Sequence, residues 1–217
     1  MKNKFLTFGL LISTSAIIFS CKCEMDSATV NTNKIESDTV DVAQKKSEGT
    51  LDENNNYVYN IGELSDLVLP NGDTLNIGSE SSESKLFAQL NDKNFKVSDD
   101  KTQGWITLDR VYFETGQSDV TENSNQQVEN ISKILKAFPQ ATVKVGGYTD
   151  NVGDSIVNVK VSTERANSIT KSLVSKGIGA GRITSEGYGA QHFLCPTNDS
   201  DLCNAQNRRV DIRVTKK

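Results

Sequence analysis

The spacing of apolar residues separates a polar segment from two patterned regions. Apolar residues are isolated between residues 22 and 56, which contain no aromatic residue, and they recur at regular intervals from Tyr57 onward. A segment this polar cannot bury enough apolar area to offset the entropy lost on ordering. We therefore predict that residues 21–56 form a flexible tether and that order begins near Tyr57.

Residues 57–104 have the pattern of a small N-terminal subdomain. Apolar arms flank the Pro-Asn-Gly turn at residues 70–72, which predicts a β-hairpin. Leu86 and Leu90 then lie four positions apart, which predicts a helix over about residues 82–90. A unit of this size would be marginally stable alone, so we expect it to pack on the domain that follows.

The pattern from Trp105 onward predicts a larger α+β domain over residues 105–217. Helical spacing and strict alternation predict helices over 123–138 and 155–176 and strands over 105–113, 142–148, 183–188 and 209–214. The order β-α-β-α-β-β implies two right-handed crossovers and a final antiparallel strand. The expected architecture is a pair of helices packed on a mixed four-stranded sheet.

Residues 1–20 have the features of a secretory signal peptide. A short basic stretch precedes an apolar run, Phe5 to Phe19, that is too short and too polar for a membrane span. The run ends at Ser20-Cys21, which resembles the lipobox of bacterial lipoproteins, in which the cysteine is lipidated and becomes the mature N-terminus. The alternative is ordinary cleavage near Ala16, with Cys21 left as a plain thiol.

The charge of the chain argues against a nucleic-acid partner. The chain has 24 basic and 28 acidic residues, a net charge of −4, and removal of residues 1–20 takes away two lysines and makes it 22 − 28 = −6. Affinity for nucleic acid depends on basic residues that neutralise phosphates. Membrane attachment would likewise depend on acyl chains and not on attraction to anionic lipids.

Two cysteines lie between the last two predicted strands. Cys195 and Cys203 are 203 − 195 = 8 positions apart, and in an exported protein such a pair predicts a disulfide. A metal site is the weaker alternative, because His192 is the only histidine and no second Cys/His pair has ligand spacing. We expect neither a metal nor a cofactor.

The stretch from Gly146 to Ala166 contains the candidate chemistry. Asp150 follows the second predicted strand and Arg165 lies in the helix after it, so both side chains should reach the crevice at the strand ends. A carboxylate and a guanidinium set a short distance apart suit a zwitterion, which would place an ammonium against Asp150 and a carboxylate on Arg165. The alternative is that the two side chains simply pair with each other.

Several motifs together resemble the OmpA-like C-terminal domain, as found in OmpA-like lipoproteins of the Bacteroidetes. They are Tyr148-Thr149-Asp150, Asn158-x-x-Val161-Ser162-x-x-Arg165-Ala166, Lys176-Gly177-Ile178, Gly187-Tyr188-Gly189 and Asn207-Arg208-Arg209-Val210. The resemblance covers roughly residues 105–217 and implies a domain that binds peptidoglycan non-covalently.

The resemblance also implies roles for single residues. Asp150 and Arg165 would grip the zwitterionic end of diaminopimelate in the stem peptide, and the same pocket would be lined by Thr149, Asn158 and Val161. We expect Asn207 and Arg208 to support the pocket rim. Arg209 should pair with a surface acid.

Two other functions remain as alternatives to a wall-binding protein. A wall-acting hydrolase would need two carboxylates in a cleft, and Asp150 with Asp154 is the only close acidic pair nearby. A stator anchor, which some OmpA-like domains serve as, would need a retained membrane helix with a carboxylate, and residues 5–19 contain no acid. We therefore expect a non-enzymatic outer-membrane lipoprotein whose periplasmic domain links the envelope to the wall.

Overall fold

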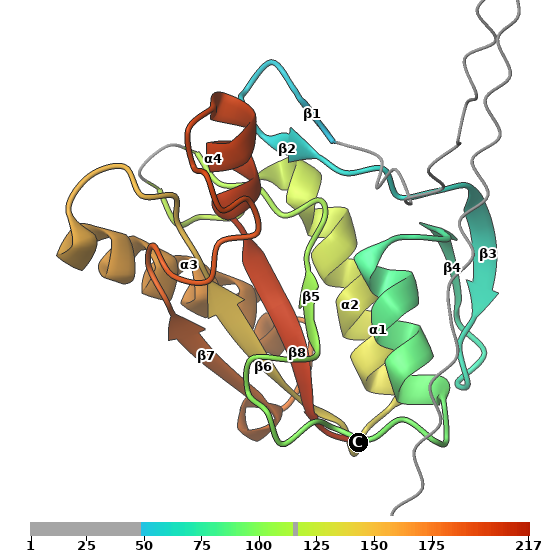
Figure 1. The fold of residues 1–217 in the computed structure, drawn as a ribbon. Helices are drawn as coiled ribbons and strands as arrows, with labels where there is room; N and C mark the ends of the chain where they lie inside the picture. The colour runs from blue at the N-terminus through green and yellow to red at the C-terminus, as the bar shows by residue number, and fades with distance from the viewer. Residues whose placement is uncertain (1–48, 115–116) are drawn as a thin grey trace, which may run out of the picture. The chain divides into compact units, whose positions relative to one another are not determined.

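The computed structural model describes residues 49–114 and 117–217. The predicted signal peptide and the lipidation site at Cys21 lie outside these residues. The elements are β1 (Thr50–Leu51), β2 (Tyr57–Val58), β3 (Leu64–Val68), β4 (Thr74–Gly78), α1 (Ser82–Asn91), β5 (Trp105–Thr107), α2 (Asn125–Ala137), β6 (Thr142–Gly147), α3 (Ser155–Ser175), β7 (Ile183–Gly187), α4 (Asp201–Asn207) and β8 (Val210–Lys216), with 3-10 turns at Glu122–Ser124 and Ala180–Arg182 (Figure 1). Within the described ranges, no helix combines the length and apolar character needed to cross a membrane.

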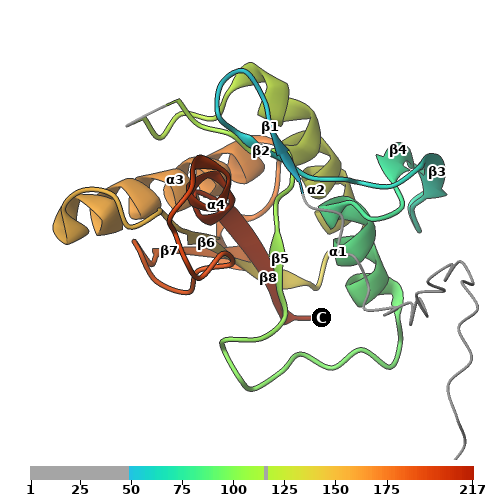
Figure 2. The ribbon, with the colours of Figure 1, turned by 45° about the horizontal axis from the view of Figure 1, so that its top comes forward.

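The main sheet is mixed and four-stranded, which confirms the predicted α+β fold. Its strand order is β5-β8-β6-β7, in which β6 and β7 are parallel and β8 runs antiparallel to both of its neighbours. Helices α2 and α3 cover one face of the sheet (Figures 1 and 2). Alternation places Val143, Val145 and Ile212 on this face, where they join one hydrophobic core with Ile131 and Ile169.

The N-terminal hairpin and helix share that core. β3 and β4 pair in register from Leu64 with Gly78 to Val68 with Thr74, and α1 follows after a Ser81 cap. Leu75 and Leu86 are buried in the same cluster as the α2 side chains. The segment is therefore stabilised by packing on the larger domain, and its described residues share that domain's core.

The first strand of the domain is shorter than predicted. β5 ends at Thr107 and not at residue 113, although the Leu108 N–H still donates to the Val210 carbonyl at 2.9 Å. The buried Asp109 carboxylate accepts hydrogen bonds from the Ser82 N–H, at the start of α1, and from Gln127 in α2. A buried carboxylate needs such donors, so the chain leaves the sheet at this point to reach them.

Part of the predicted tether, residues 49–56, has regular structure. β1 pairs antiparallel with β2, and the Gly49 N–H donates to the Tyr57 hydroxyl at 2.9 Å. The expectation that a tether extends to residue 56 is thus wrong for residues 49–56. Figure 1 shows this hairpin beside α4, a short helix that the sequence pattern did not predict, and both strands contact it.

Candidate functional site

Two glycines let α3 lie directly on the ends of β6 and β7. A Cβ atom at Gly147 would be 2.0 Å from the Ser162 carbonyl oxygen, and one at Gly187 would be 2.2 Å from the Thr163 nitrogen. The Ser162 hydroxyl also accepts a hydrogen bond from the Gly189 N–H at 2.9 Å. This close approach brings the polar side chains of α3 next to the loops that follow the strands.

The turn between β6 and α3 holds Asp150 in place. One Asp150 carboxylate oxygen accepts the Val152 N–H at 3.1 Å, and the Asn158 side-chain amide donates to the Val152 carbonyl at 3.1 Å. Asp154 is the N-cap of α3, where its carboxylate accepts two backbone N–H groups. Asp154 is exposed and does not line the cavity described next, so the sequence's acidic pair does not form a two-carboxylate cleft.

A cavity of about 490 Å³ opens at these strand ends, and we call it the strand-end cavity. Of the seven residues predicted to bind the ligand, the six that line it are Thr149, Asp150, Asn158, Val161, Arg165 and Arg208. They come from the β6–α3 turn, from α3 and from the end of α4. The fold therefore brings them together, while their roles in binding stay predictions.

Asp150 and Arg165 do not pair with each other in the described part of the chain. Asp150 instead accepts a hydrogen bond from Arg208 at 2.8 Å. The Arg165 Nε donates to the Gln117 carbonyl at 3.1 Å, and its guanidinium carbon lies 5.0 Å from the centre of the Phe113 ring. The two opposite charges thus line one cavity without neutralising each other.

The Arg165 guanidinium is buried at an electrostatic cost. Arg165 is only 6% exposed to solvent. Burial lowers the pKa of Arg165, the nearby Arg208 charge lowers the pKa further, and only Asp150 opposes these effects. An anionic group placed in the cavity would offset both unfavourable influences.

Several polar atoms around the cavity have no hydrogen-bond partner among the described residues. They are the Thr149 hydroxyl, the Tyr59 hydroxyl and one terminal nitrogen of Arg209. All three residues line the strand-end cavity. These atoms themselves have almost no accessible surface, so they show that the cavity wall is incompletely hydrogen-bonded and do not by themselves offer contacts to a ligand.

The N-terminal extension forms a wall that the sequence did not reveal. Asn54, Asn55 and Asn56, in the β1–β2 turn, line the cavity, and Arg208 donates to the Asn55 carbonyl at 3.1 Å. Arg208 therefore connects this turn to Asp150, which is consistent with the expected position at the rim. The three asparagines have no sequence pattern that predicts contact with a cavity formed by residues about a hundred positions later.

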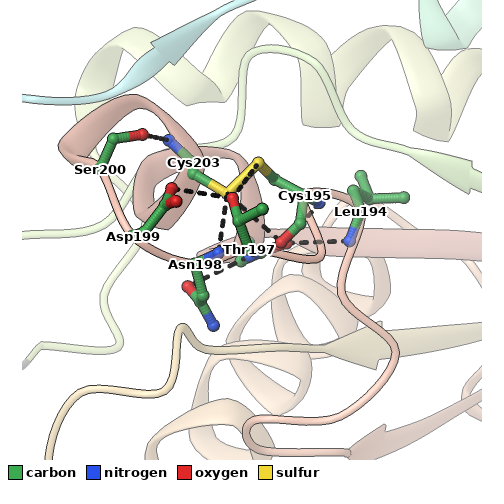
Figure 3. Close-up of a disulfide and its surroundings, with 8 residues drawn as sticks. Leu194, Cys195, Thr197, Asn198, Asp199, Ser200 and Cys203 are labelled. Carbon is green, nitrogen blue, oxygen red and sulfur yellow. Dashed lines mark hydrogen bonds between the residues drawn. A yellow bond between two sulfur atoms is a disulfide. The ribbon is translucent and has the colours of Figure 1, made fainter.

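Asn207 is the one predicted ligand-binding residue that does not line the cavity. It is fully buried and accepts hydrogen bonds from the Leu194 and Cys195 N–H groups at 2.9 and 3.0 Å. The predicted disulfide between Cys195 and Cys203 is present, with an S–S distance of 1.96 Å (Figure 3). Asn207 thus holds the disulfide loop and does not face a ligand in the cavity.

The prediction that Arg209 pairs with a surface acid is also wrong, because its partner is a buried acid. Arg209 pairs with Asp211 at 3.1 Å, but Asp211 is 3% exposed and lies on the central strand β8. Burial raises the pKa of Asp211, and the adjacent Arg209 charge opposes that shift. The Arg209 guanidinium carbon is also 3.9 Å from the centre of the Tyr148 ring, so this pair belongs to a buried cluster.

The chain thus forms a small α+β domain with a polar cavity where strand ends meet a helix. Residues 112–208 match the model of the OmpA family, and the chain therefore contains an OmpA family domain.

Sequence relatives carry the same region. "Probable lipoprotein YiaD" of Escherichia coli (strain K12) is 30% identical over 105 residues, which are 48% of this chain and 48% of the relative. "Outer membrane porin F" of Pseudomonas aeruginosa is 36% identical over 110 residues, which are 50% of this chain and 31% of the relative. The chain thus spans about half the length of the first of these relatives and less of the second.

Solved structures include the peptidoglycan-associated lipoprotein from Burkholderia pseudomallei. It aligns with a TM-score of 0.47 and 24% sequence identity, over 58% of this chain and 99% of that chain.

Proposed function

We propose that the OmpA family domain binds peptidoglycan and that the strand-end cavity takes the zwitterionic end of diaminopimelate in the stem peptide. The observation that carries this proposal is that Asp150 and Arg165 line one cavity without pairing with each other. Asp150 pairs with Arg208, so the Arg165 guanidinium has no carboxylate partner among the described residues and its charge is left for a ligand. Held apart, they offer one site for an ammonium and one for a carboxylate.

The charges around the cavity suit such a ligand. The ammonium would bind Asp150, which already interacts with Arg208, and the carboxylate would bind the terminal nitrogens of Arg165. With two guanidinium groups near one carboxylate, the site attracts the carboxylate end of the ligand most strongly.

The expected affinity for one stem peptide is modest. Each charge-assisted hydrogen bond in a partly shielded site contributes about 1.5–3 kcal/mol. Two such contacts imply a dissociation constant on the order of micromolar to millimolar. A wall repeats the epitope many times, so weak single-site binding is sufficient for stable attachment.

A binding role is better supported than catalysis. The acid nearest to Asp150 in the sequence, Asp154, is occupied as the cap of α3 and does not line the cavity. A glycosidase-type mechanism needs a second carboxyl group across the scissile bond. The other acid that lines the cavity, Asp201, is an exposed residue in the first turn of α4. We therefore propose a structural link between envelope and wall and no hydrolytic activity.

Arg165→Ala tests the proposed binding mode. Loss of its carboxylate contact, about 2 kcal/mol, should weaken binding to purified sacculi and to a diaminopimelate-containing stem peptide about 30-fold. The free energy of unfolding should change little, because burial and Arg208 already disfavour the Arg165 charge. Sedimentation with sacculi, peptide calorimetry and urea unfolding measure the three quantities.

Arg182→Ala is the matched control for that experiment. Arg182 donates to the carbonyls of Leu135, Phe138 and Ala141, away from the cavity. Its loss should lower the free energy of unfolding and leave sacculus binding unchanged. Equal wall binding by Arg165→Ala and wild type would refute the proposed site, and a stability loss like that of Arg182→Ala would make Arg165 a structural residue.

We also propose that the protein is attached to the outer membrane by a lipid on Cys21, with the domain in the periplasm. The support is the lipobox-like sequence at Ser20-Cys21 and relatives named as a lipoprotein and an outer-membrane porin. Cys21→Ala should move the protein from the membrane fraction to the soluble fraction of cells. Continued membrane association of this variant would contradict lipid attachment.

A further inference from the structure

The face of the sheet opposite α2 and α3 has its own side-chain composition. Figure 2 shows that the described helices α2 and α3 lie on the other side of the sheet. Strand alternation directs aromatic and charged residues to this face, and they line a second cavity of about 820 Å³, which we call the sheet-face cavity. The residues that matter most for its chemistry are Trp105, Lys144, Tyr148, Glu186, Tyr188 and His192.

Four aromatic rings form a platform in this cavity. Tyr148 and Tyr188 stack with ring centres 5.1 Å apart, and Trp105 and His192 stand nearly perpendicular to both. The rings fit over Gly146, where a Cβ atom would lie 3.0 Å from ring atoms of Trp105 and Tyr188. Tyr148 is buried, whereas Trp105 and Tyr188 are partly exposed and His192 is exposed. The platform therefore presents ring surface to a ligand.

Apart from the exposed Lys101, the charged groups of the cavity interact with partners in the described part of the fold. Lys144 pairs with Glu186, which also accepts a hydrogen bond from the Tyr188 hydroxyl at 3.1 Å. The Arg213 guanidinium donates to backbone carbonyls, at 2.7 Å to that of Gln103. Such groups offer hydrogen bonds without a strong demand for a counter-ion, which suits a neutral ligand that is rich in hydroxyl and amide groups.

The two cavities adjoin at Arg209, which lines both of them. Along β6 and the turn after it, Tyr148 lines the sheet-face cavity, while the next residue, Thr149, lines the strand-end cavity. The Arg209 guanidinium lies 3.9 Å from the centre of the Tyr148 ring and so packs directly against the platform. A polymer with an amino-acid branch in one cavity would have its main chain close to the other.

We propose that the sheet-face cavity binds the glycan strand of peptidoglycan, a chain of β-linked N-acetylated hexoses. Pyranose rings have C–H faces that stack on aromatic rings, and their hydroxyl and acetamido groups hydrogen-bond with polar side chains at the edge. The choice of this ligand rests on the proposed function, because the peptide tip assigned to the strand-end cavity is covalently joined to such a glycan. The two cavities together would bind the branch and the backbone of one polymer.

Trp105 provides a direct test, because it is the only tryptophan in the chain. Titration with the N-acetylglucosamine tetramer, and with peptide-free glycan strands from amidase-treated sacculi, should change its fluorescence in a saturable way. His192→Asn removes one exposed ring and should weaken binding of the tetramer about five-fold. Asparagine is chosen because residue 192 has a φ angle of 55°, which asparagine tolerates.

Tyr188→Ala and Tyr188→Phe form the matched pair. The alanine variant removes the stacking ring and should weaken tetramer binding at least as much as His192→Asn, whereas the phenylalanine variant keeps the ring and should bind within about two-fold of wild type. Thermal unfolding of each variant shows whether the fold is intact. If Tyr188→Ala is unfolded, His192→Asn decides the result alone.

Arg165→Ala separates this proposal from the proposed function. It should bind the tetramer like wild type while losing the stem peptide. Wall binding that depends on Arg165, together with no Trp105 response to either glycan probe, would overturn the glycan site and leave the proposed function standing. A Trp105 response to the sugar-free stem peptide and not to the glycan would also overturn it. A glycan response together with Arg165-independent wall binding would support the glycan site and reject the peptide site.

Discussion

Two clusters of buried charge have similar side chains but differ in whether each charged side chain has an oppositely charged partner among the described residues. The first, which we call the closed cluster, joins α1 to α2 and consists of Glu83, Asp109, Arg110, Gln127 and Asn130. Each carboxylate oxygen of its two acids accepts at least one hydrogen bond. The second cluster is Asp150, Arg165 and Arg208, at the strand-end cavity.

The difference between the clusters matches a structural role for the first and the binding role that we propose for the second. In the closed cluster each carboxylate oxygen of Glu83 and Asp109 has a hydrogen-bond donor within the fold, so the cluster fixes α1 against the domain. At the cavity, Asp150 and Arg165 are kept apart, and the Thr149 hydroxyl has no partner among the described residues. Buried polar groups that remain incompletely paired are characteristic of sites that a ligand completes.

Gln127→Leu should have the largest effect on stability. The Gln127 side-chain amide lies within hydrogen-bond distance of Ser82, Glu83 and Asp109. Its loss leaves the buried Asp109 Oδ1 without a hydrogen-bond donor, while Glu83 Oε2 keeps that of the Ser82 hydroxyl. We expect the free energy of unfolding to fall by about 3 kcal/mol, measured by urea denaturation. Binding to sacculi should be unchanged at temperatures where the variant is folded.

Gln126→Leu is the control for that variant. Gln126 is exposed and makes a single side-chain hydrogen bond, to Asn130, so its replacement should cost no more than about 0.5 kcal/mol. Similar losses in the two variants would mean that the closed cluster does not depend on its central amide. A loss of wall binding in folded Gln127→Leu would mean that the two clusters are not independent.

The sequence was sufficient to predict the α+β fold and the position of Asp150 and Arg165 at one cavity. Strand alternation and helical spacing are local signals, and a strand end followed by a helix delivers both side chains to one crevice. The predicted strand at β5 was too long because the alternation of residues continues through Tyr112. In the structure, the chain leaves the sheet after Thr107, and Asp109 accepts hydrogen bonds from α1 and α2. A local sequence pattern cannot predict hydrogen-bond partners that are this far away in the sequence.

The wrong assignments near the cavity have the same origin. Asn207 and Arg208 are adjacent in the sequence, yet Asn207 points into the disulfide loop and Arg208 to the cavity. Arg209 and Asp211 alternate like residues on a solvated strand face, but aromatic rings and a loop cover that face and bury them. The β1–β2 turn was missed because its few apolar residues give no periodic signal.

The smallest expected effect is the pH dependence contributed by Asp109. Burial raises the pKa of the Asp109 carboxyl above its usual value of 3.8, and the adjacent Glu83 charge raises the pKa further. The folded state therefore binds the proton more tightly than the unfolded state does. The contribution of Asp109 to the free energy of unfolding should then fall as pH rises from about 3.8 through the folded-state pKa.

Asp109→Asn removes this titration and isolates it from that of the other acids. The difference in unfolding free energy, wild type minus variant, should decrease as the pH of urea denaturation rises from acidic to neutral. Asp100→Asn is the opposite control, because hydrogen bonds from Thr102 lower the pKa of Asp100, so the corresponding difference should increase with pH. If both differences change with pH in the same direction, burial does not dominate the ionisation of Asp109, and the closed cluster compensates its carboxylate more fully than its geometry implies.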